Sequence, residues 1–548
     1  MPLQKNQVLT LQVERLSSDG SGVAHSPEGE TVFIPGAAPG DEARVRIVKD
    51  CKRYAFGILD EVLTPSPDRI PVDCAVAGPC GGCSLRHLDY AAELRAKQEN
   101  VADAFARIGG LDVPVLPIVG SPEIDRYRNK VQFPVGTDKA GRPCIGFYAG
   151  RTHRIVPCPD CRLQPGVLNE IGNTLCAFFA EKGIHPYNEE TGKGLVRHIF
   201  LRRGAHSGQI MVCLVCTRAK LPSADELCTR LKEAFPDIVT ILLNVNAKNT
   251  NVILGSETHT LYGQGYIEDT LCGVPVQLGP LSFYQVNTLA AEQLYGIAAE
   301  YAQLTPDDLL LDLYCGMGTI GLSMADHCRE LVGVEIVPEA IESAKANAAR
   351  MGTAVSAKSR FFCADAGQAA AQLAADGLHP DVVMLDPPRK GCDEATLSAV
   401  VRMAPRRVVY VSCNPATAAR DAAWLEQNGY HAEKVQPVDL FPRTKHVETV
   451  VLLSKLKVDH HIEIELKMDE LDLTAAESKA TYDEIKAYVL NKYGLKVSQL
   501  YIAQIKRKCG IIERKNYNVS KKEDAKVPQC PPEKEAAIMD ALKHFQMI

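Results

Sequence analysis

The pattern of hydrophobic and polar positions changes several times along the chain. Residues 5–62 alternate apolar and polar side chains in stretches such as VLTLQVERL and EARVRIVKD, which glycine-rich turns separate. Alternation with a period of two predicts β-strands with one buried face, and several short strands of this kind predict a small OB-like β-barrel. We place this barrel at residues 1–65.

Two further patterns follow the barrel. Residues 66–282 mix a cysteine cluster, one helical stretch near 89–108 and strand signals such as NKVQFPV and QIMVCLVC, which together predict an α+β domain. Over residues 283–457, short apolar strands alternate with alanine-rich helices, from LLLDLYC to TVVLLSKL. That alternation predicts a doubly wound, Rossmann-like α/β domain with a parallel sheet.

The last segment, residues 458–548, has a different character. The acidic stretch DHHIEIELKMDELDL precedes three short helical patterns, and residues 479–526 carry twelve Lys and Arg against five Asp and Glu. The formal net charge of the whole chain is −6. A basic, helix-turn-helix-like extension on an acidic chain predicts an accessory contact with nucleic acid or with a ribosomal protein.

Length and composition narrow the class of protein. A chain of 548 residues is expected to form roughly three or four domains. Its apolar runs stay well below the ~18 residues of a membrane helix, and MPLQKNQ at the N-terminus lacks the apolar core of a signal peptide. We therefore expect a cytoplasmic, monomeric protein with no membrane contact, whose nineteen cysteines serve packing, metal binding or catalysis rather than disulfides.

A glycine-rich loop opens the α/β domain. The stretch DLYCGMGTIG, residues 312–321, follows an apolar strand and begins a helix, where glycines let the backbone approach a ligand. Glu335 ends the next strand, where a carboxylate accepts hydrogen bonds from ribose hydroxyls. A dinucleotide and S-adenosylmethionine both fit this loop. Asp312, four residues before the first glycine, favours the cationic methionine part of S-adenosylmethionine, and a dinucleotide-dependent oxidoreductase is the alternative.

Further strand ends carry reactive groups to the same edge of the predicted sheet. DVVMLDPPRKG ends its strand at Asp386, VVYVSCNPAT presents Cys413, and KHVETVVLL places Glu448 just before the final strand. Ligands of open α/β sheets bind at the carboxyl ends of the strands. A free thiol has a pKa of about 8.5, so a reactive cysteine needs a cation such as Arg389, or a helix N-terminus, beside it.

A thiol, a carboxylate and a methyl-donor pocket together define a specific reaction, the methylation of carbon-5 of uracil. That carbon is too weak a nucleophile to attack S-adenosylmethionine unaided. A thiolate that adds to carbon-6 makes carbon-5 enolate-like and reactive. After methyl transfer, a base removes the carbon-5 proton and the thiol is eliminated.

The motifs DPPRKG, SCNP and HVET, in this order after FYQVN and DLYCGMG, resemble those of the RNA uracil-5-methyltransferase family, in particular its 23S ribosomal RNA branch. The resemblance covers roughly residues 5–455 and implies that Cys413 is the nucleophile and Glu448 the base. The cofactor contacts that it implies are Gln285, Tyr314, Thr319, Glu335, Asp365 and Asp386. Thr319 stands where the family often has asparagine, and Phe283 is placed to stack on an RNA base.

A cysteine cluster lies in the predicted central domain. The stretch CAVAGPCGGC contributes Cys74, Cys80 and Cys83, and CPDC offers Cys158 or Cys161 as the fourth ligand that three thiolates need. The family resemblance favours Cys161 and a [4Fe-4S] iron-sulfur cluster. A zinc ion held by four cysteines is the alternative, because the spacing does not distinguish the two.

Two features point to RNA as the partner. The N-terminal barrel resembles a TRAM domain, a small RNA-binding module, and the central segment interleaves basic and aromatic residues in YRNK, GRTHR and VRHIFLRRG. An enzyme that modifies a base must take it out of its stack, so a surface that grips RNA is expected. The predicted substrate is 23S rRNA, with tRNA as the alternative, because the tRNA branch typically lacks both the barrel and the cluster. A non-catalytic RNA-binding protein is the non-enzymatic alternative, against which Cys413 and Glu448 argue.

Overall fold

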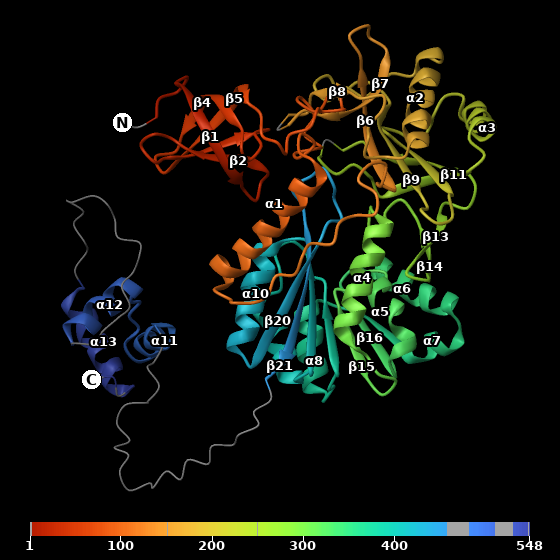
Figure 1. Cartoon of the computed structure of the whole chain (residues 1–548). Helices are drawn as coiled ribbons and strands as arrows, with labels where there is room; N and C mark the ends of the chain where they lie inside the picture. The colour runs from red at the N-terminus through yellow and green to blue at the C-terminus, as the bar shows by residue number, and fades with distance from the viewer. Residues whose placement is uncertain are drawn as a thin grey trace. The chain divides into compact units, whose positions relative to one another are not determined.

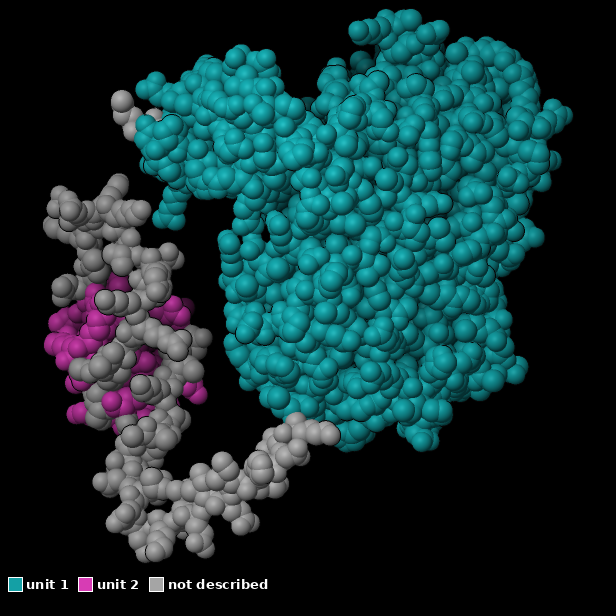
Figure 2. Space-filling view, in the orientation of Figure 1, with its two compact units in different colours: residues 1–457 teal, residues 458–548 magenta. Residues whose placement is uncertain are grey.

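The computed structural model describes residues 3–150, 152–248, 250–456, 482–509, 530–545 and 547. The chain divides into two compact units, residues 1–457 and residues 458–548, which Figure 2 shows in different colours. Unit 1 contains an N-terminal barrel, a central sheet and a C-terminal sheet, in this order along the chain (Figure 1). The functional residues predicted from the sequence all belong to unit 1.

The first part of unit 1 is a closed barrel of five strands in the order β1-β2-β3-β5-β4. Its strands are β1 (Val8–Leu16), β2 (Ser21–His25), β3 (Thr31–Pro35), β4 (Glu42–Asp50) and β5 (Tyr54–Thr64). In β4, the side chains of Ala43, Val45 and Ile47 are buried. The residues between them are exposed, so alternate side chains of the strand point into the barrel core and out of it, as the period-two pattern predicts.

Helix α1 (Tyr90–Asp103), continued by a short π-helix (Ala104–Gly109), leads from the barrel toward the C-terminal sheet. Asp89 caps α1 by accepting a hydrogen bond from the backbone N–H of Ala92 at 2.7 Å. Phe105 packs in the hydrophobic core of that sheet. The helix therefore joins the barrel to the site that the sheet carries.

The central part is a mixed seven-stranded sheet in the order β12-β11-β10-β9-β6-β7-β8. Its elements are β6 (Lys130–Thr137), β7 (Pro143–Tyr148), β8 (Ile155–Pro157), α2 (Gly166–Glu181), β9 (Val196–Arg203), β10 (Ile210–Cys216), α3 (Ala224–Ala234), β11 (Ile238–Val245) and β12 (Glu257–Tyr262). Strand β10 is buried along its whole length, as the continuous apolar run IMVCLVC predicts. A hairpin of β13 (Ile267–Leu271) and β14 (Val274–Leu278) leads on to the third part.

The C-terminal part of unit 1 is a second seven-stranded sheet, in the order β17-β16-β15-β18-β19-β21-β20. Its strands are β15 (Leu309–Leu313), β16 (Glu330–Glu335), β17 (Ser359–Cys363), β18 (Val382–Leu385), β19 (Arg407–Ser412), β20 (Tyr430–Val438) and β21 (Glu448–Lys455). β15 to β19 run parallel to one another, whereas β21 runs antiparallel to both β19 and β20. The strand order reverses between β15 and β18, where open α/β sheets form their ligand crevice.

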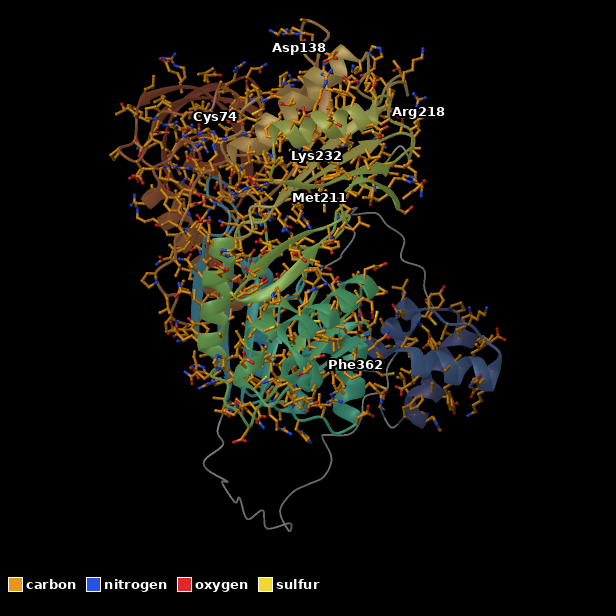
Figure 3. All side chains as sticks on the ribbon, turned by 90° about the vertical axis from the view of Figure 1, so that its right-hand side faces the viewer. Cys74, Asp138, Met211, Arg218, Lys232 and Phe362 are labelled. Carbon is orange, nitrogen blue, oxygen red and sulfur yellow. The ribbon has the colours of Figure 1, made fainter. Side chains whose placement is uncertain are left out.

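Helices flank this sheet and complete the Rossmann-like α/β fold. They are α4 (Thr288–Ala302), α5 (Thr319–Ser323), α6 (Pro338–Met351), α7 (Thr353–Lys358), α8 (Ala366–Ala375), α9 (Glu394–Met403) and α10 (Pro415–Gln427). Two large clusters of buried apolar side chains cover the two faces of the sheet. Figure 3 places Phe362, on the edge strand β17, far from Cys74 in the segment that follows the barrel. The predicted succession of barrel, α+β part and Rossmann-like part is confirmed.

Unit 2 is a small group of helices with its own hydrophobic core. The described helices are α11 (Tyr482–Tyr493), α12 (Gln499–Lys508) and α13 (Pro532–His544). Ile485, Ile502 and Ile538 are buried in the core between them. The acidic stretch and residues 479–481 and 510–526 of the basic segment lie outside the described residues. None of the helices that the structure describes is long and apolar enough to cross a membrane.

A buried network of charges holds α1 against the loop between β20 and β21. The Lys97 ammonium donates hydrogen bonds to Glu93 Oε1 and Asp439 Oδ1, both at 2.8 Å, and to the carbonyl of Phe441 at 3.2 Å. The three charged side chains are at most 1% exposed. The backbone N–H of Arg443 donates to Glu93 Oε1 at 2.7 Å. Since loss of one partner from a buried pair typically costs about 3–5 kcal/mol, this network fixes the loop that leads into β21.

Candidate active site

The structure brings the predicted reactive residues to one edge of the C-terminal sheet. Cys413 directly follows β19, Asp386 directly follows β18, and Glu448 is the first residue of β21. Because β21 is antiparallel to β19, with Thr449 opposite Ser412, the start of β21 meets the end of β19. Cys413 and Glu448 are therefore neighbours although they lie on strands of opposite direction.

The SCNP motif builds a rigid turn around Cys413. Ser412 Oγ accepts a hydrogen bond from the backbone N–H of Asn414 at 3.1 Å. The Asn414 side chain caps α10 by accepting from the N–H of Ala416 at 3.2 Å, and Pro415 occupies the first turn of that helix. Asn414 Nδ2 also donates to the carbonyl of Arg389 at 3.0 Å. One asparagine thus fixes the helix that follows the thiol and the loop that carries the neighbouring arginine.

The electrostatic surroundings of Cys413 act in opposite directions. Burial and the negative charge of Glu448 raise the pKa of the thiol above its ordinary value. The Arg389 guanidinium, which hydrogen-bonds the thiol, opposes that rise in pKa. Arg389 is therefore the group of this site that favours the thiolate, the reactive form of cysteine.

Glu448, which is buried, and Asp386, which is half-buried, form an acidic pair beside the thiol. Burial raises the pKa of Glu448 well above its usual range, and the charge of Asp386 adds to this effect while Arg389 opposes it. Burial raises the pKa of Asp386 to about 7. Carboxyl groups with pKa values moved toward neutrality are suited to exchange protons with a substrate.

A third acidic side chain, Asp312, lies beneath the glycine-rich loop. Burial raises its pKa to about 8. Its Oδ2 accepts a hydrogen bond from the backbone N–H of Gly321 at 3.0 Å, whereas its Oδ1 is buried without a partner. A buried carboxylate oxygen with no partner fits a cationic ligand group, such as the ammonium or sulfonium of S-adenosylmethionine.

The loop itself is shaped by left-handed backbone and by Glu335. Tyr314 has φ 65°, and Gly316 and Gly318 have φ 56° and 79°, so the chain turns sharply between β15 and α5. The Glu335 carboxylate accepts hydrogen bonds from the N–H groups of Gly316 at 3.1 Å and Val337 at 2.9 Å. These bonds hold the predicted ribose-binding carboxylate beside the loop.

Gln285 and Thr319 come from different elements and meet at Tyr295. The hydroxyls of Thr319 and Tyr295 lie 3.4 Å apart, and Gln285 also hydrogen-bonds Tyr295. The backbone carbonyl of Gln285 accepts from Asn129 Nδ2 at 2.7 Å. Tyr295 on α4, which the sequence analysis missed, therefore joins two predicted cofactor contacts.

Tyr314 and Asp365, two other predicted cofactor contacts, make hydrogen bonds to helices α9 and α8. The hydroxyl of Tyr314 lies 3.3 Å from that of Thr396 on α9. Asp365 caps α8 by accepting a hydrogen bond from the N–H of Gln368 at 3.2 Å. Their contact with a cofactor stays a prediction.

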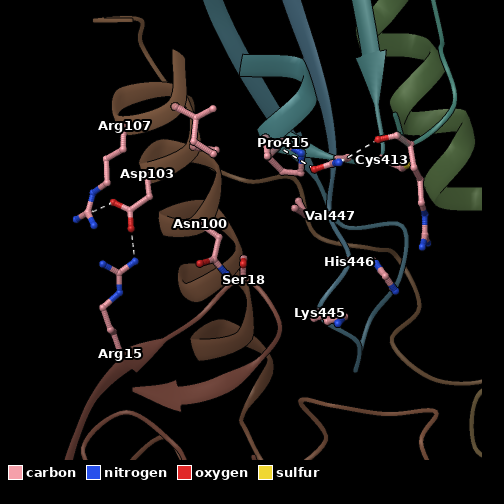
Figure 4. Close-up of a pocket in the computed structure, with 15 residues that line it drawn as sticks. Arg15, Ser18, Asn100, Asp103, Arg107, Cys413, Pro415, Lys445, His446 and Val447 are labelled. Carbon is pink, nitrogen blue, oxygen red and sulfur yellow. Dashed lines mark hydrogen bonds and ion pairs between the residues drawn. The ribbon is translucent and has the colours of Figure 1, made fainter. Parts of the chain in front are cut away.

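A cavity of about 470 Å³ opens beside Cys413 (Figure 4). Three parts of unit 1 form its walls: the barrel, helix α1 with its π-helical end, and the rim of the C-terminal sheet. The lining residues are Arg15, Ser18, Asn100, Asp103, Ala104, Arg107, Ile108, Arg389, Cys413, Asn414, Pro415, Ala416, Lys445, His446 and Val447. Burial, with Arg389 and Lys445 nearby, lowers the pKa of His446 to about 4, so its ring is neutral at neutral pH. No local sequence pattern indicates the walls that the barrel and α1 contribute to this cavity.

The cysteine cluster lines a second, smaller cavity, of about 90 Å³. Cys74, Cys80, Cys83, Cys158 and Cys161 all contribute to its walls. A hydrogen bond from Cys158 lowers the pKa of Cys161 to about 7, whereas burial raises that of Cys83 to about 12. Within the described ranges, no three His, Cys, Asp or Glu side chains are arranged so that they could hold a metal ion.

Three arginines surround the same cysteine-lined cavity. Arg86, Arg128 and Arg162 line it, and each leaves one buried N–H group without a hydrogen-bond partner. Buried donors of this kind are costly unless an acceptor satisfies them. An anionic group ligated by thiolates would supply acceptors, so the donor set fits such a group.

The sheet order, the glycine-rich loop with Glu335 and the buried Asp312 fit a methyltransferase that uses S-adenosylmethionine. Residues 277–456 match the family model described as tRNA (Uracil-5-)-methyltransferase, and residues 2–59 match that of the TRAM domain. An uncharacterized RNA methyltransferase of Halalkalibacterium halodurans is 44% identical over 453 residues, which are 82% of this chain and 98% of that protein. One of Clostridium tetani is 41% identical over 454 residues, 83% of this chain and 98% of that protein.

A solved structure agrees with these matches. The tRNA (uracil-54, C5)-methyltransferase of Pyrococcus abyssi, in complex with S-adenosyl-L-homocysteine, is similar with a TM-score of 0.65 and 28% identity, over 82% of this chain and 100% of that one. The chain belongs to the RNA uracil-5-methyltransferase family. It is an S-adenosylmethionine-dependent enzyme that acts on RNA, which decides against the dinucleotide-dependent oxidoreductase and the non-catalytic RNA-binding protein.

The reactivity of the Cys413 thiol tests the electrostatics of this site. We expect alkylation of Cys413 by iodoacetamide to accelerate as the pH rises above neutrality, because burial and Glu448 keep the thiol pKa above its ordinary value. Arg389→Gln removes the opposing cation and should shift the profile to higher pH. Mass spectrometry of the Cys413 peptide gives the rate at each pH. Lys390→Gln, a change at the exposed neighbouring position, is the control that leaves the profile unchanged; an unshifted Arg389→Gln profile would contradict the assignment.

Proposed function

We propose that this enzyme methylates carbon-5 of a uridine in 23S rRNA through a covalent bond between Cys413 and carbon-6 of the base. The observation that carries the proposal is the placement of the Cys413 thiol beside the Glu448 carboxyl, at the sheet edge and next to the cavity. A thiolate that reaches carbon-6 and a base that reaches the carbon-5 proton of the same pyrimidine are what this reaction requires.

The side chains of the site divide the reaction between them. Arg389 stabilises the thiolate of Cys413, which attacks carbon-6 and leaves carbon-5 with the electron pair of an enolate. S-adenosylmethionine, when bound, supplies the methyl group that carbon-5 takes up. The Glu448 carboxylate then accepts the carbon-5 proton, and the returning electron pair expels the Cys413 thiolate. Asp312 and Glu335 are the carboxylates placed to hold the cationic and ribose parts of the cofactor.

The choice of ribosomal RNA rests on the motif resemblance to the 23S branch. The P. abyssi enzyme, whose name gives tRNA as its substrate, aligns over 82% of this chain. A relative that acts on tRNA therefore shares most of this architecture, and tRNA is the second candidate substrate. Either RNA would be met in the cytoplasm, the compartment that the sequence predicts.

A [4Fe-4S] cluster bound by Cys74, Cys80, Cys83 and Cys161 is the proposed occupant of the cysteine-lined cavity. A zinc ion holds its sulfur ligands at about 2.3 Å, so it draws four thiolates tightly together. The cysteines instead surround a cavity of about 90 Å³, which leaves room between them for a cluster larger than a single ion. Cys158, which is buried and hydrogen-bonded to Cys161, is the alternative fourth ligand.

Phe283 is proposed to stack on an RNA base. Its side chain is 71% exposed, which is unusual for a large aromatic residue. The buried Arg202 guanidinium holds the surrounding loop by donating to the carbonyls of Gly279 and Ser282, both at 2.8 Å. An exposed ring on a braced loop suits stacking with an unpaired base.

Unit 2 is proposed to make an accessory contact with nucleic acid. It has its own core, and the last turn of α12 carries three successive basic residues, Lys506 to Lys508. The family model ends at residue 456, so this unit lies outside the matched methyltransferase domain.

The covalent mechanism predicts different outcomes for its two residues. Cys413→Ala should abolish transfer of labelled methyl groups to ribosomal RNA, since no thiolate can activate carbon-5, while leaving S-adenosylmethionine binding intact. Glu448→Gln should instead accumulate a protein–RNA adduct, because the carbon-5 proton remains in place. Denaturing gels with labelled RNA resolve the adduct. Full activity of Cys413→Ala would rule out the mechanism. Mapping methylated uridines in RNA from cells with and without the protein identifies the target uridine and decides between ribosomal and transfer RNA.

The metal proposal is tested on protein purified without oxygen. We expect iron and acid-labile sulfide in nearly equal amounts and a brown absorbance, both lost in Cys83→Ser. The matched control is Cys213→Ser, which changes a buried cysteine of strand β10 outside the cavity. A colourless protein with one zinc per chain would overturn the assignment.

Removal of unit 2 tests its contact with nucleic acid. A chain ending at Lys457 should keep its methyl-transfer rate at saturating RNA but bind RNA more weakly and with a shallower dependence on salt, because phosphate contacts are lost. Filter binding across a salt series measures both quantities. Unchanged affinity and unchanged salt dependence would show that unit 2 does not bind RNA.

A further inference from the structure

The cavity beside Cys413 has an excess of positive charge that the chemistry of methyl transfer does not require. Arg15 comes from β1 of the barrel, Arg107 from the π-helix after α1, and Lys445 from the loop before β21. Asp103 is the single acidic residue among the lining residues. Figure 4 shows Arg15 and Arg107 approaching Asp103 from two sides, on the wall across from Cys413.

Asp103 holds the two arginines rather than neutralising them. Arg15 Nη2 donates to Asp103 Oδ2, and Arg107 Nη2 lies 3.3 Å from Asp103 Oδ1. Arg15 and Asp103 are 37% and 33% exposed, and Arg107 is 70% exposed. One carboxylate shared by two guanidiniums leaves a net positive charge, and each guanidinium has five N–H donors, most of which stay available to a ligand.

The barrel is firmly placed over the rim, so the position of Arg15 is fixed. Leu16 and Ala38 of the barrel form a small buried cluster with Leu85 and Leu88, which precede α1. In the turn after β1, a Cβ added at Gly20 would lie 3.4 Å from the side chains of both Leu85 and Lys445. The turn of the barrel therefore lies next to the loop that lines the cavity.

From this arrangement we infer that the cavity is a subsite for the sugar-phosphate of the RNA strand next to the target uridine. Arg15 and Arg107 bind the phosphate, which makes the barrel part of the active site. The inference rests on the proposed function, because the strand must enter beside Cys413. Guanidinium forks match phosphate oxygens, and a volume of 470 Å³ falls within the ~300–1,000 Å³ of ligand sites. A base taken out of its stack brings its flanking phosphates along the pocket wall.

The experiment measures binding of a labelled short oligouridylate by fluorescence anisotropy across a salt series. Arg15→Gln and Arg107→Gln should each lower affinity about tenfold and make the slope of log affinity against log salt shallower by about 0.7, the value for one phosphate contact on single-stranded RNA. Arg44→Gln is the matched control, since Arg44 lies on the same barrel, is half-exposed and is likewise paired with a carboxylate, at 2.7 Å.

The outcomes separate this subsite from the proposed function. Wild-type affinity and salt slope in both variants, or an equal loss in Arg44→Gln, would overturn the subsite. Because oligouridylate binding needs no methyl transfer, weaker binding by the two variants supports the subsite even if the wild-type protein methylates no uridine. A wild-type protein that methylates no uridine would refute only the proposed function. Thermal unfolding of each variant, expected at the wild-type temperature, shows that the binding defect is local.

Discussion

The buried ion pairs of Lys97 with Glu93 and Asp439 are the constraint on which the geometry of the active site depends. The Arg443 guanidinium lies 3.7 Å from Glu93, so the network contains two cations and two anions. Its charges are therefore neutralised within the protein rather than by water. One side of the network is helix α1 and the other is the loop before β21. Helix α1 carries Asp103, and the loop leads into Glu448. The buried ion pairs therefore set the distance between the two walls of the cavity.

Crowding of carboxyl groups is the second organising feature. Asp312, Asp386 and Glu448 are gathered at one edge of the sheet, on β15, after β18 and at the start of β21, and burial raises the pKa of each. Groups with raised pKa values hold protons near neutral pH, and a cationic ligand would favour their ionised forms. The protein therefore tolerates acidic groups whose repulsion is relieved when positive charge enters the crevice. Arg389 supplies part of that charge permanently, and Asn414 holds its backbone in place.

The alternation of strands and helices predicts which reactive residues meet at the edge of the sheet. Contacts between distant segments do not follow from any local sequence pattern. In a parallel sheet the strand ends converge, so Cys413 and Asp386 could be placed together from SCNP and DPPRKG. The contact of Arg15 with Asp103 joins residues 88 positions apart, and neither the barrel alternation nor the helix pattern indicates it. The orphaned oxygen of Asp312 and the arginines around the cysteines likewise become visible only when burial is known.

The close fit of Gly20 against Leu85 and Lys445 bears on how such an enzyme changes over evolution. A small RNA-binding barrel at a chain terminus is often regarded as an interchangeable module. Here its first turn lies against Leu85 and Lys445, and its residues form a wall of the reaction cavity. Replacing the barrel with another module would remove one wall of the reaction cavity together with the RNA-binding surface. RNA recognition and catalysis therefore have to change together during evolution.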